Sequence, residues 1–554
     1  MEKKNLINKV SFIFKNKKIL FLYFFAIFII SSFIELISLS LIIPFILLIS
    51  NPSFLIGEYS FMNLNFSFSQ SSLTISIITF LLVKYLLMLY INYYIPKFAY
   101  THQRELRIRI LKNFFSKNYL SNSNELVQLT LGTLQIFTSQ FIISLLKIAS
   151  SVLILSFVTI YLILFDPFIS FFLIILFALI FLFYNFYLKN RFKLFGQIVI
   201  NSSENIILGT TEIYKGFQEI TIYDKTKFFL DKLSKFGNEL SSAEIKTRFL
   251  INLPRFFLEV IVLFSLFSIV LIYPDQTSHE NSILSIGVFG FAALRIIPAL
   301  TECIAHLNNI KYANKTVDTI YNSIKNEKNS TIRKKSALKN DLKEIQIKNL
   351  SYKYPKNNQK IINNLSFKIK KGETVGIVGQ SGSGKSTLVK IILGLIKPSK
   401  GTILYNGLNK KIQNISSYIP QDIFVIRGSV RENITLTSEK NENQDKQIWS
   451  SLQRSGLYNF IQSKKEKLSF IIEDEGNNLS GGQKQRIAVA RAIFHKKDLI
   501  VLDEATSSLD LERENKILKD LHKDKKLTKI IISHKKNIRN YCNKVIEFKN
   551  LTNK

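Results

Sequence analysis

The stretch GETVGIVGQSGSGKSTLVKIILGL (residues 372–395) decides how the last third of the chain folds. It begins with an apolar, β-branched run, passes through GQSGSGKS at 379–386 and continues with the apolar spacing of a helix. The pattern G-x-x-x-x-G-K-[ST] between a strand and a helix predicts a phosphate-binding loop. Its backbone N–H groups and the positive end of the helix dipole would face phosphate oxygens.

The same loop supplies side chains for a nucleotide and its metal ion. We expect the ammonium of Lys385 to reach the β- and γ-phosphates, and the hydroxyl of Ser386 to bind Mg²⁺. The alternative is a glycine-rich turn that binds no nucleotide, and the Lys-Ser pair between a strand and a helix argues against it. The nucleotide-binding residues predicted in this loop are Gly379, Ser381, Gly382, Gly384, Lys385, Ser386 and Thr387.

Two acidic residues end a second predicted strand. The segment DLIVLDEAT (498–506) places four apolar residues before Asp503 and Glu504. Because ligands bind at the carboxyl ends of parallel strands, these carboxylates would lie beside the phosphate loop. Asp503 would hold Mg²⁺, directly or through water, and Glu504 would polarise an attacking water.

The segment NLSGGQKQRIAVARAI (478–493) predicts a second anion-binding site. Ser480, Gly481 and Gly482 open an amphipathic helix and would expose backbone N–H groups at its N-terminus. One domain cannot easily close both anion sites over a single nucleotide. The pattern therefore favours a composite site built by two chains.

The first 310 residues have a different composition from the rest of the chain. They hold nearly all the long apolar runs of a 554-residue sequence that is 47% hydrophobic. We predict six membrane spans, each with the roughly 20 apolar-rich residues that a bilayer requires. The predicted spans are 19–50, 72–96, 136–165, 167–189, 250–273 and 283–306.

Charge alternates along the predicted loops. Segments 51–71 and 274–282 contain no Lys or Arg, whereas 97–135 and 190–249 are rich in both. This alternation places both termini on the cytoplasmic side. It also explains the net charge of +34, which in a soluble protein would favour nucleic acid. A soluble ATPase acting on DNA or ribosomes would account for the charge but not for six spans, so no nucleic-acid partner is expected.

The two basic segments have helical periodicity, so the spans should continue as helices into the cytoplasm, with bends near 114–126 and 213–225. The polar, charged residues 322–341 read as a linker. The predicted domains are therefore a transmembrane domain at 1–321, a linker at 322–341 and a nucleotide-binding domain at 342–554.

The order of the motifs carries a family resemblance. The phosphate loop is followed by YIPQD, LSGGQ, LIVLDE, SSLD and ISH, and this order resembles the nucleotide-binding domain of ABC transporters over about 342–549. Six spans with long inner loops are similar to the exporter half of that family. The resemblance implies an all-α, six-helix transmembrane domain followed by an α/β P-loop nucleotide-binding domain.

The resemblance also implies an activity and a location. ATP and Mg²⁺ would be the cofactors, and ATP hydrolysis would be coupled to transport by a homodimer with twelve spans. The protein would lie in a bacterial cytoplasmic (inner) membrane, with its ATPase domain in the cytoplasm. An importer would usually place its spans on a separate chain, and the intact motifs argue against an inert regulator.

Further residues receive roles only through this resemblance. Tyr354 would stack on adenine, although a packed strand tyrosine is the alternative. Gln421 would sense Mg²⁺ and the attacking water and couple them to the membrane helices. The partner chain's site would be completed by Ser480, Gly482 and Gln483. Asp510 would cross the dimer interface, and His534 would contact the γ-phosphate. In EDEGNN, before LSGGQ, Asp474 or Glu475 would take the acidic coupling role.

Charged residues inside the predicted spans bear on the substrate. A charge at mid-depth costs at least ~2.5 kcal/mol, so it normally faces protein or a wet cavity. Arg255 and Glu259 are four residues apart and can pair on one helix face. Lys84 and Arg295 have no such neighbour, and Glu35 is a possible counter-ion. Internal pairing or snorkelling is one interpretation, and a basic cavity for an anionic group is the other.

A looser resemblance favours the basic cavity. The segments LPRFFLEV (253–260) and ALRIIPALTECIAHLNNI (293–310) are similar to bacterial lipid-linked oligosaccharide flippases, on the basis of Arg255, Arg295, Pro298 and Lys84. This resemblance implies that Lys84, Arg255 and Arg295 meet the pyrophosphate of a lipid-linked anionic substrate. An exporter of peptides, drugs or phospholipids is the alternative.

Overall fold

The computed structural model describes most of the chain. The residues outside the described part are 1, 16, 42–58, 62–63, 67–69, 118–122, 273–278, 326–341, 355–359, 381, 409–411, 413, 440, 505–514, 516–517, 521, 523, 535 and 549–554. The chain forms two compact units, Met1–Ile332 and Arg333–Lys554. Their boundary falls inside the predicted linker 322–341, whose first residues belong to a helix that ends at Ile324.

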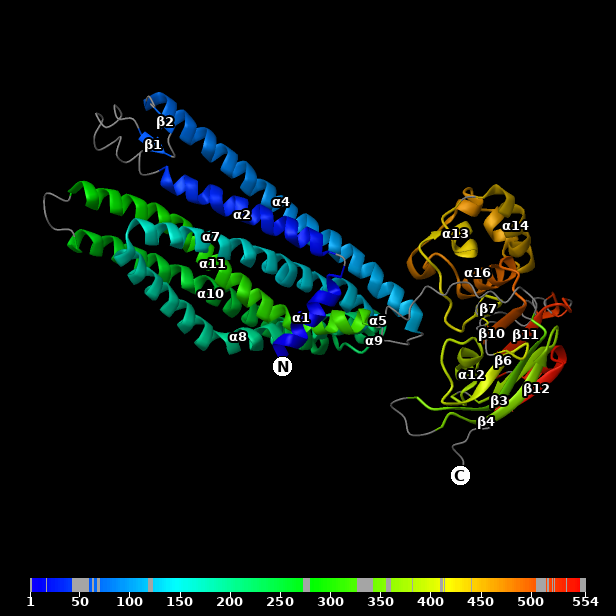
Figure 1. Ribbon diagram of the computed structural model, residues 1–554. Helices are drawn as coiled ribbons and strands as arrows, with labels where there is room; N and C mark the ends of the chain where they lie inside the picture. The colour runs from blue at the N-terminus through cyan, green and yellow to red at the C-terminus, as the bar shows by residue number, and fades with distance from the viewer. Residues whose placement is uncertain are drawn as a thin grey trace. The chain divides into compact units, whose positions relative to one another are not determined.

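The first unit is a bundle of long helices (Figure 1). The six predicted spans all fall on helices, and the last part of the first predicted span, 42–50, lies outside the described residues. The long helices are α2 (Lys18–Ser40), α4 (Gln70–Lys117), α7 (Ile143–Phe165), α8 (Pro167–Lys215), α10 (Thr226–Ile272) and α11 (His279–Ile324). The shorter helices are α1 (Glu2–Ile13), α5 (Ser123–Val127), α6 (Leu134–Ile136) and α9 (Phe217–Ile222).

The bundle has the composition of a membrane domain. By length and apolar composition, four described segments can cross a bilayer: Lys18–Ser40, Ile77–Phe115, Glu125–Phe165 and Ile286–Ile324. Large apolar side chains such as Leu86, Ile160 and Phe264 point outward and are more than half exposed. Lipid is the solvent in which such a surface is stable, because helices in a bilayer need not bury every apolar side chain.

The described parts of the segments predicted to extend the spans are helical. Helix α8 continues to Lys215, the short α9 follows, and α10 begins at Thr226. The predicted bend at 213–225 therefore lies where the chain turns from α8 to α10. In the segment predicted to be the first outer loop, strand β1 (Tyr59–Phe61) pairs antiparallel with β2 (Leu64–Phe66).

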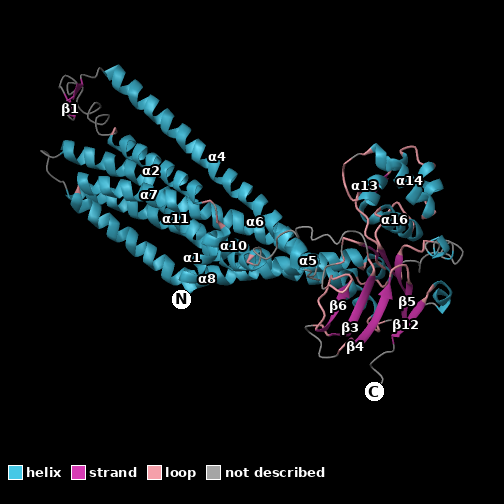
Figure 2. Cartoon of the chain, turned by 45° about the vertical axis from the view of Figure 1, so that its right-hand side comes forward, coloured by secondary structure: helices cyan, strands magenta, loops and turns pink. Residues whose placement is uncertain are grey.

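The second unit is built around a parallel sheet with the strand order β12-β5-β11-β10-β7 (Figure 2). Its strands are β5 (Thr374–Gly379), β7 (Ser416–Ile419), β10 (Leu499–Asp503), β11 (Thr528–Ser533) and β12 (Lys544–Phe548). Every residue of β10 and β11 is buried, which explains their nearly continuous apolar sequence. Since the strands run parallel, their carboxyl ends gather at one edge of the sheet.

Two smaller parts complete this unit. An antiparallel sheet is formed by β3 (Glu344–Tyr352), β4 (Ile362–Lys370) and β6 (Lys400–Tyr405), in the order β4-β3-β6. A helical part contains α13 (Val430–Thr435), α14 (Asp445–Arg454), α15 (Tyr458–Gln462) and α16 (Gly481–Phe494). Strands β8 (Gly428–Ser429) and β9 (Ile471–Ile472) pair beside it.

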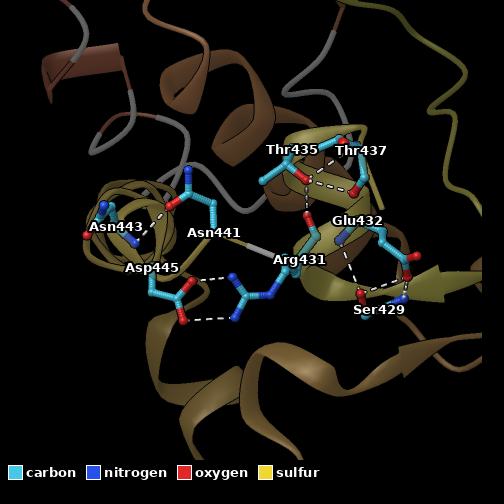
Figure 3. A network of polar contacts seen from close by, with 8 residues as sticks. All are labelled: Ser429, Arg431, Glu432, Thr435, Thr437, Asn441, Asn443 and Asp445. Atoms are coloured by element: carbon cyan, nitrogen blue, oxygen red, sulfur yellow. Dashed lines mark hydrogen bonds and ion pairs between the residues drawn. The ribbon is translucent and has the colours of Figure 1, made fainter. Parts of the chain in front are cut away.

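Polar contacts hold the helical part together (Figure 3). Ser429 caps α13 and accepts a hydrogen bond from the backbone N–H of Glu432, whose side chain in turn accepts one from the Ser429 N–H. Both terminal nitrogens of Arg431 contact the carboxylate of Asp445, the first residue of α14. The cap orients one helix and the two-point ion pair fixes the next one against it.

Candidate functional site

The phosphate loop connects β5 to α12 (Lys385–Ile392). Gly382 and Gly384 have φ angles of 80° and 99°, in the left-handed region that favours glycine. A Cβ atom on Gly384 would lie 2.5 Å from Cγ2 of Ile361, and one on Gly379 would lie 2.6 Å from the carbonyl oxygen of Phe548. The loop conformation therefore requires the glycines that the motif supplies. The predicted site residue Ser381 lies outside the described residues.

Lys385 is held against this loop. Its side chain is buried, and Nζ donates hydrogen bonds to the carbonyl oxygens of Gly379 (2.9 Å) and Gln380 (2.7 Å). These contacts keep the ammonium at the loop that the sequence predicts will surround phosphates. A phosphate oxygen would offer the same ammonium a charged acceptor in place of a neutral carbonyl.

Asp503 is the last residue of β10 and is buried at the carboxyl end of the sheet. Only 2% of its side chain is exposed. The hydroxyl of Ser386 donates to Oδ1 over 3.1 Å, and the hydroxyl of Tyr418 donates to Oδ2 over 3.0 Å. Burial raises the pKa of the Asp503 carboxyl, and these two hydrogen bonds act in the opposite direction. The site thus brings together Ser386 and Asp503, two of the three residues predicted for the Mg²⁺ site, whereas the third, Gln421, contacts Glu504.

Glu504 faces the two other predicted catalytic residues. Its Oε2 atom accepts a hydrogen bond from Nε2 of Gln421 over 3.1 Å, and Oε1 lies 3.8 Å from Nδ1 of His534. Glu504 has a φ angle of 51°, so the chain turns sharply after β10 and aims this side chain differently from Asp503. The three residues come from the ends of three neighbouring parallel strands, β7, β10 and β11.

The donor set fits a magnesium ion that a nucleotide helps to hold. Mg²⁺ usually takes one or two protein oxygens and completes its shell with water and phosphate. Ser386 and Asp503 provide a hydroxyl and a carboxylate in contact with one another. In the part of the chain that the structure describes, no group of three or more His, Cys, Asp or Glu could bind a metal without such help.

The LSGGQ segment adopts the predicted helix N-terminus. Ser480 is the N-cap of α16, its hydroxyl accepts from the N–H of Gln483, and its own N–H donates to Oε1 of Gln483. Gly482 lies in the first turn of this helix. Ser480 and Gly481 are exposed, and Gly482 and Gln483 are half-buried, so this end of α16 is partly accessible.

The remaining residues whose roles come from the family resemblance lie in different environments. The ring of Tyr354, two residues after β3, is half-buried against the core. Its hydroxyl lies 3.2 Å from Oγ1 of Thr387 in α12, the helix that follows the phosphate loop. Asp510 lies outside the described residues. Asp474 contacts Arg427 at 3.7 Å on the exposed surface, and Glu475 has a φ of 54°.

Sequence reasoning missed Tyr418. It is the first residue of the YIPQD segment, and its hydroxyl reaches Asp503 because β7 lies directly beside β10. The signal was present, since a tyrosine near the end of a strand that precedes Gln421 can approach the same edge. The pKa of Tyr418 is raised by burial and by the neighbouring Asp503 charge, so its hydroxyl stays a donor.

The charged residues of the helical unit form a buried cluster. The carboxylate of Glu35 on α2 lies 2.9 Å from Nζ of Lys84 on α4 and 2.6 Å from Nε of Arg295 on α11. Lys84 also donates to the hydroxyl of Ser38. Glu35 and Lys84 are each 2% exposed, whereas the Arg295 side chain is 30% exposed. Glu35 is therefore the counter-ion of both cations, and Arg295 alone reaches out of the cluster.

Arg255 has a different environment. Its Nε atom donates to Glu259 over 2.8 Å, the i,i+4 pair that the spacing predicts, and 67% of its side chain is exposed. Two cavities lie near the buried cluster, and Arg295 lines both, whereas Arg255 lines neither. The structure thus brings Lys84 and Arg295 together and leaves Arg255 apart from them.

Comparison with known proteins agrees with this architecture. The family profile described as ABC transporter matches residues 362–507. The chain is 30% identical over 351 residues to the lactococcin-G-processing and transport ATP-binding protein LagD of Lactococcus lactis subsp. lactis, covering 60% of this chain and 48% of that protein. It is 28% identical over 362 residues to the ATP-dependent lipid A-core flippase of Wigglesworthia glossinidia brevipalpis, covering 63% and 61%.

A solved structure extends the comparison to both units. A bacterial Atm1-family ABC exporter with ATP bound superposes with a TM-score of 0.71 at 16% identity, over 94% of this chain and 92% of that one. The chain spans about half of the length of LagD and about three-fifths of the length of the flippase. Residues 362–507 therefore match the ABC transporter family, and the chain as a whole has the fold of an ABC exporter.

Proposed function

We propose that the chain binds and hydrolyses ATP at the phosphate-loop site and uses the energy to export or flip an anionic, lipid-linked substrate. The proposed ATP hydrolysis rests on one observation: the ends of β7, β10 and β11 meet beside the phosphate loop. Lys385, Ser386 and Asp503 lie at the loop, and Glu504 stands next to them in contact with Gln421 and His534.

Each residue has a chemical task at this site. Ser386 and Asp503 would hold Mg²⁺, which supplies charge neutralisation between the phosphates when it is bound. Lys385 places a cation at the phosphates. Glu504 accepts a proton from, or orients, the attacking water, and Gln421 and His534 fix the direction of its carboxylate. Tyr354 would provide an aromatic face for adenine.

The active unit is proposed to be a homodimer in a bacterial cytoplasmic membrane, with both termini in the cytoplasm. The partly accessible N-terminus of α16, with Ser480, Gly482 and Gln483, would contact the γ-phosphate bound by the other copy. ATP would then join the two nucleotide-binding domains, and hydrolysis would release them. The long helices α8 and α10 would carry this movement to the spans.

The substrate part rests on the charged cluster of the spans. Arg295 lines two cavities of the helical unit and has an exposed guanidinium, a group suited to phosphate oxygens. The relative that is a lipid A-core flippase favours an amphiphile. We therefore propose an anionic lipid-linked compound, and a lipid-linked oligosaccharide with a pyrophosphate is the first candidate.

Peptide export is the second candidate, because the similar LagD protein processes and transports lactococcin G according to its name. The test is ATP hydrolysis by the purified chain in liposomes, with a pyrophosphate-linked oligosaccharide lipid, a zwitterionic phospholipid or a cationic peptide added in turn. The proposal expects the anionic lipid alone to stimulate turnover. Stimulation by the peptide alone would transfer the assignment to peptide export, and absence of ATP hydrolysis would remove both.

A further inference from the structure

Two cavities with different character meet at Arg295, between helices α2, α4 and α11. The larger has a volume of about 580 Å³ and is lined mainly by apolar side chains, among them Leu39, Ile78, Leu81 and Phe291. The smaller has a volume of about 150 Å³ and a mixed lining, in which apolar side chains stand beside polar and charged ones. Leu294 and Arg295 line both cavities.

The smaller cavity is lined by two charged residues of the buried cluster and by two more, whereas Lys84 lines the larger cavity. Its ionisable lining residues are Glu35, Lys147, Arg295 and Glu302. Lys147 donates to Oδ1 of Asn92 over 2.6 Å, on the same cavity wall. Lys84 compensates Glu35 directly, and Lys147 and Glu302 have opposite signs. Counted over both cavities, Glu35, Lys84, Lys147, Arg295 and Glu302 leave one net positive charge, and Arg295 is the partly exposed member of the cluster.

The volumes set the size of what each cavity can take. The larger cavity falls within the roughly 300–1,000 Å³ of typical ligand pockets, and its lining suits a hydrocarbon chain. The smaller has room for about five water molecules at ~30 Å³ each, which is the size of a phosphate group and not of a sugar chain. A guanidinium that already uses Nε on Glu35 keeps its terminal nitrogens to contact phosphate oxygens.

We infer that this pair of cavities binds one amphiphile, with its chain in the larger cavity and a compact, singly charged phosphate head group at Arg295 in the smaller. The inference rests on the proposed function and narrows its substrate class to lipids with one phosphate, in place of the pyrophosphate named there as first candidate. A second phosphate would bring more negative charge than the groups at the two cavities balance. An attached sugar chain would have to lie outside the two cavities.

Equilibrium binding to the intact, nucleotide-free chain in nanodiscs tests this inference without any need for turnover. Three probes share one fluorescent acyl chain: a methyl phosphodiester with a single negative charge, the uncharged monoacylglycerol and the corresponding pyrophosphate. The phosphodiester is expected to bind roughly tenfold or more tightly than the uncharged probe, because it gains a charge-assisted contact. The pyrophosphate should bind no more tightly than the phosphodiester.

Variants assign the binding to the two cavities. Arg295→Gln leaves the Glu35–Lys84 pair neutral and should lose the preference for the phosphodiester, while Arg295→Lys should keep part of it. Ile78→Trp fills the larger, apolar cavity and should weaken the binding of the phosphodiester and of the monoacylglycerol equally. Arg255→Gln is the matched control: it also removes a span arginine paired with a glutamate, but one that lies outside both cavities, and it should change neither affinity.

Each alternative result has a distinct meaning. Equal affinity of the charged and uncharged probes, tighter binding of the pyrophosphate, or loss of the preference in Arg255→Gln would overturn the inference. Any of these, together with lipid-stimulated ATP hydrolysis, would leave the proposed exporter function in place. A charge preference that depends on Arg295, in a chain that hydrolyses no ATP, would support the site and remove the proposed function instead.

Discussion

Replacing Tyr418 with phenylalanine should weaken Mg²⁺ binding without removing the rest of the nucleotide site. The substitution deletes one of the two hydroxyl groups that donate to Asp503, a carboxylate that is 2% exposed. A hydrogen bond to a charged group contributes about 1.5–3 kcal/mol, which corresponds to roughly a tenfold or larger change in an equilibrium constant. Without it, burial raises the pKa of Asp503 further, and protons compete better with the metal.

The sign of the pH dependence follows from this competition. The carboxylate must be ionised to hold Mg²⁺, so the variant should lose most affinity at low pH and recover as pH rises. The assay is ATP hydrolysis as a function of Mg²⁺ concentration at several pH values between 6 and 8, with ATP held constant. We expect the Mg²⁺ concentration for half-maximal rate to rise roughly tenfold, while the rate at saturating Mg²⁺ falls much less.

Tyr405→Phe is the matched control for this measurement. The hydroxyl of Tyr405 is also buried and donates to a protein oxygen, the carbonyl of Ile392, but it does not touch Asp503. It should lower stability without a shift in the Mg²⁺ response. If Tyr418→Phe keeps the wild-type Mg²⁺ response, or shifts it no more than Tyr405→Phe does, the role assigned to Tyr418 is refuted.

Three other predictions concern single residues. Glu504→Gln should bind ATP but lose roughly 10²–10⁴-fold in turnover, and a wild-type rate in the ATPase assay would remove its assignment as base. Lys84→Met should lower stability in a thermal unfolding measurement by at most about 3–5 kcal/mol, because Glu35 stays buried and keeps only its contact with Arg295. The double variant with Glu35→Gln should recover most of this loss, and no recovery would contradict the pairing. Arg431→Ala should lower the unfolding free energy by ~1 kcal/mol at neutral pH. Since Arg431 lowers the pKa of Asp445, that loss should shrink as pH falls through the Asp445 pKa, and a pH-independent difference would exclude the pair as its cause.

The nucleotide site was predictable because its motifs encode local backbone geometry. The spacing in GQSGSGKS specifies a loop in which particular residues need positive φ, and Gly382 and Gly384 have it. The apolar run before Asp503 specifies a buried strand with its acidic residues at the end. The Arg255–Glu259 contact was predictable for the same reason, since four residues separate neighbours on one helix face.

Contacts between distant elements were not predictable in this way. The hydroxyl of Tyr418 reaches Asp503 only because β7 is the neighbour of β10 in the sheet, and no local pattern encodes strand order. Glu35 was recognised as a possible counter-ion, but its contact with both Lys84 and Arg295 depends on the packing of three helices. The cavities depend on the same packing, and so does the separation of Arg255 from Arg295.

The leaflet distribution of a fluorescent anionic amphiphile in sealed vesicles tests the central claim most directly. The vesicles contain the wild-type chain or Glu504→Gln, and a membrane-impermeant quencher reports the accessible fraction of probe before and after ATP and Mg²⁺ are added. The account predicts that ATP shifts this fraction with the wild-type chain and leaves it constant with the variant. An unchanged distribution during measurable ATP hydrolysis by the wild-type chain would contradict it.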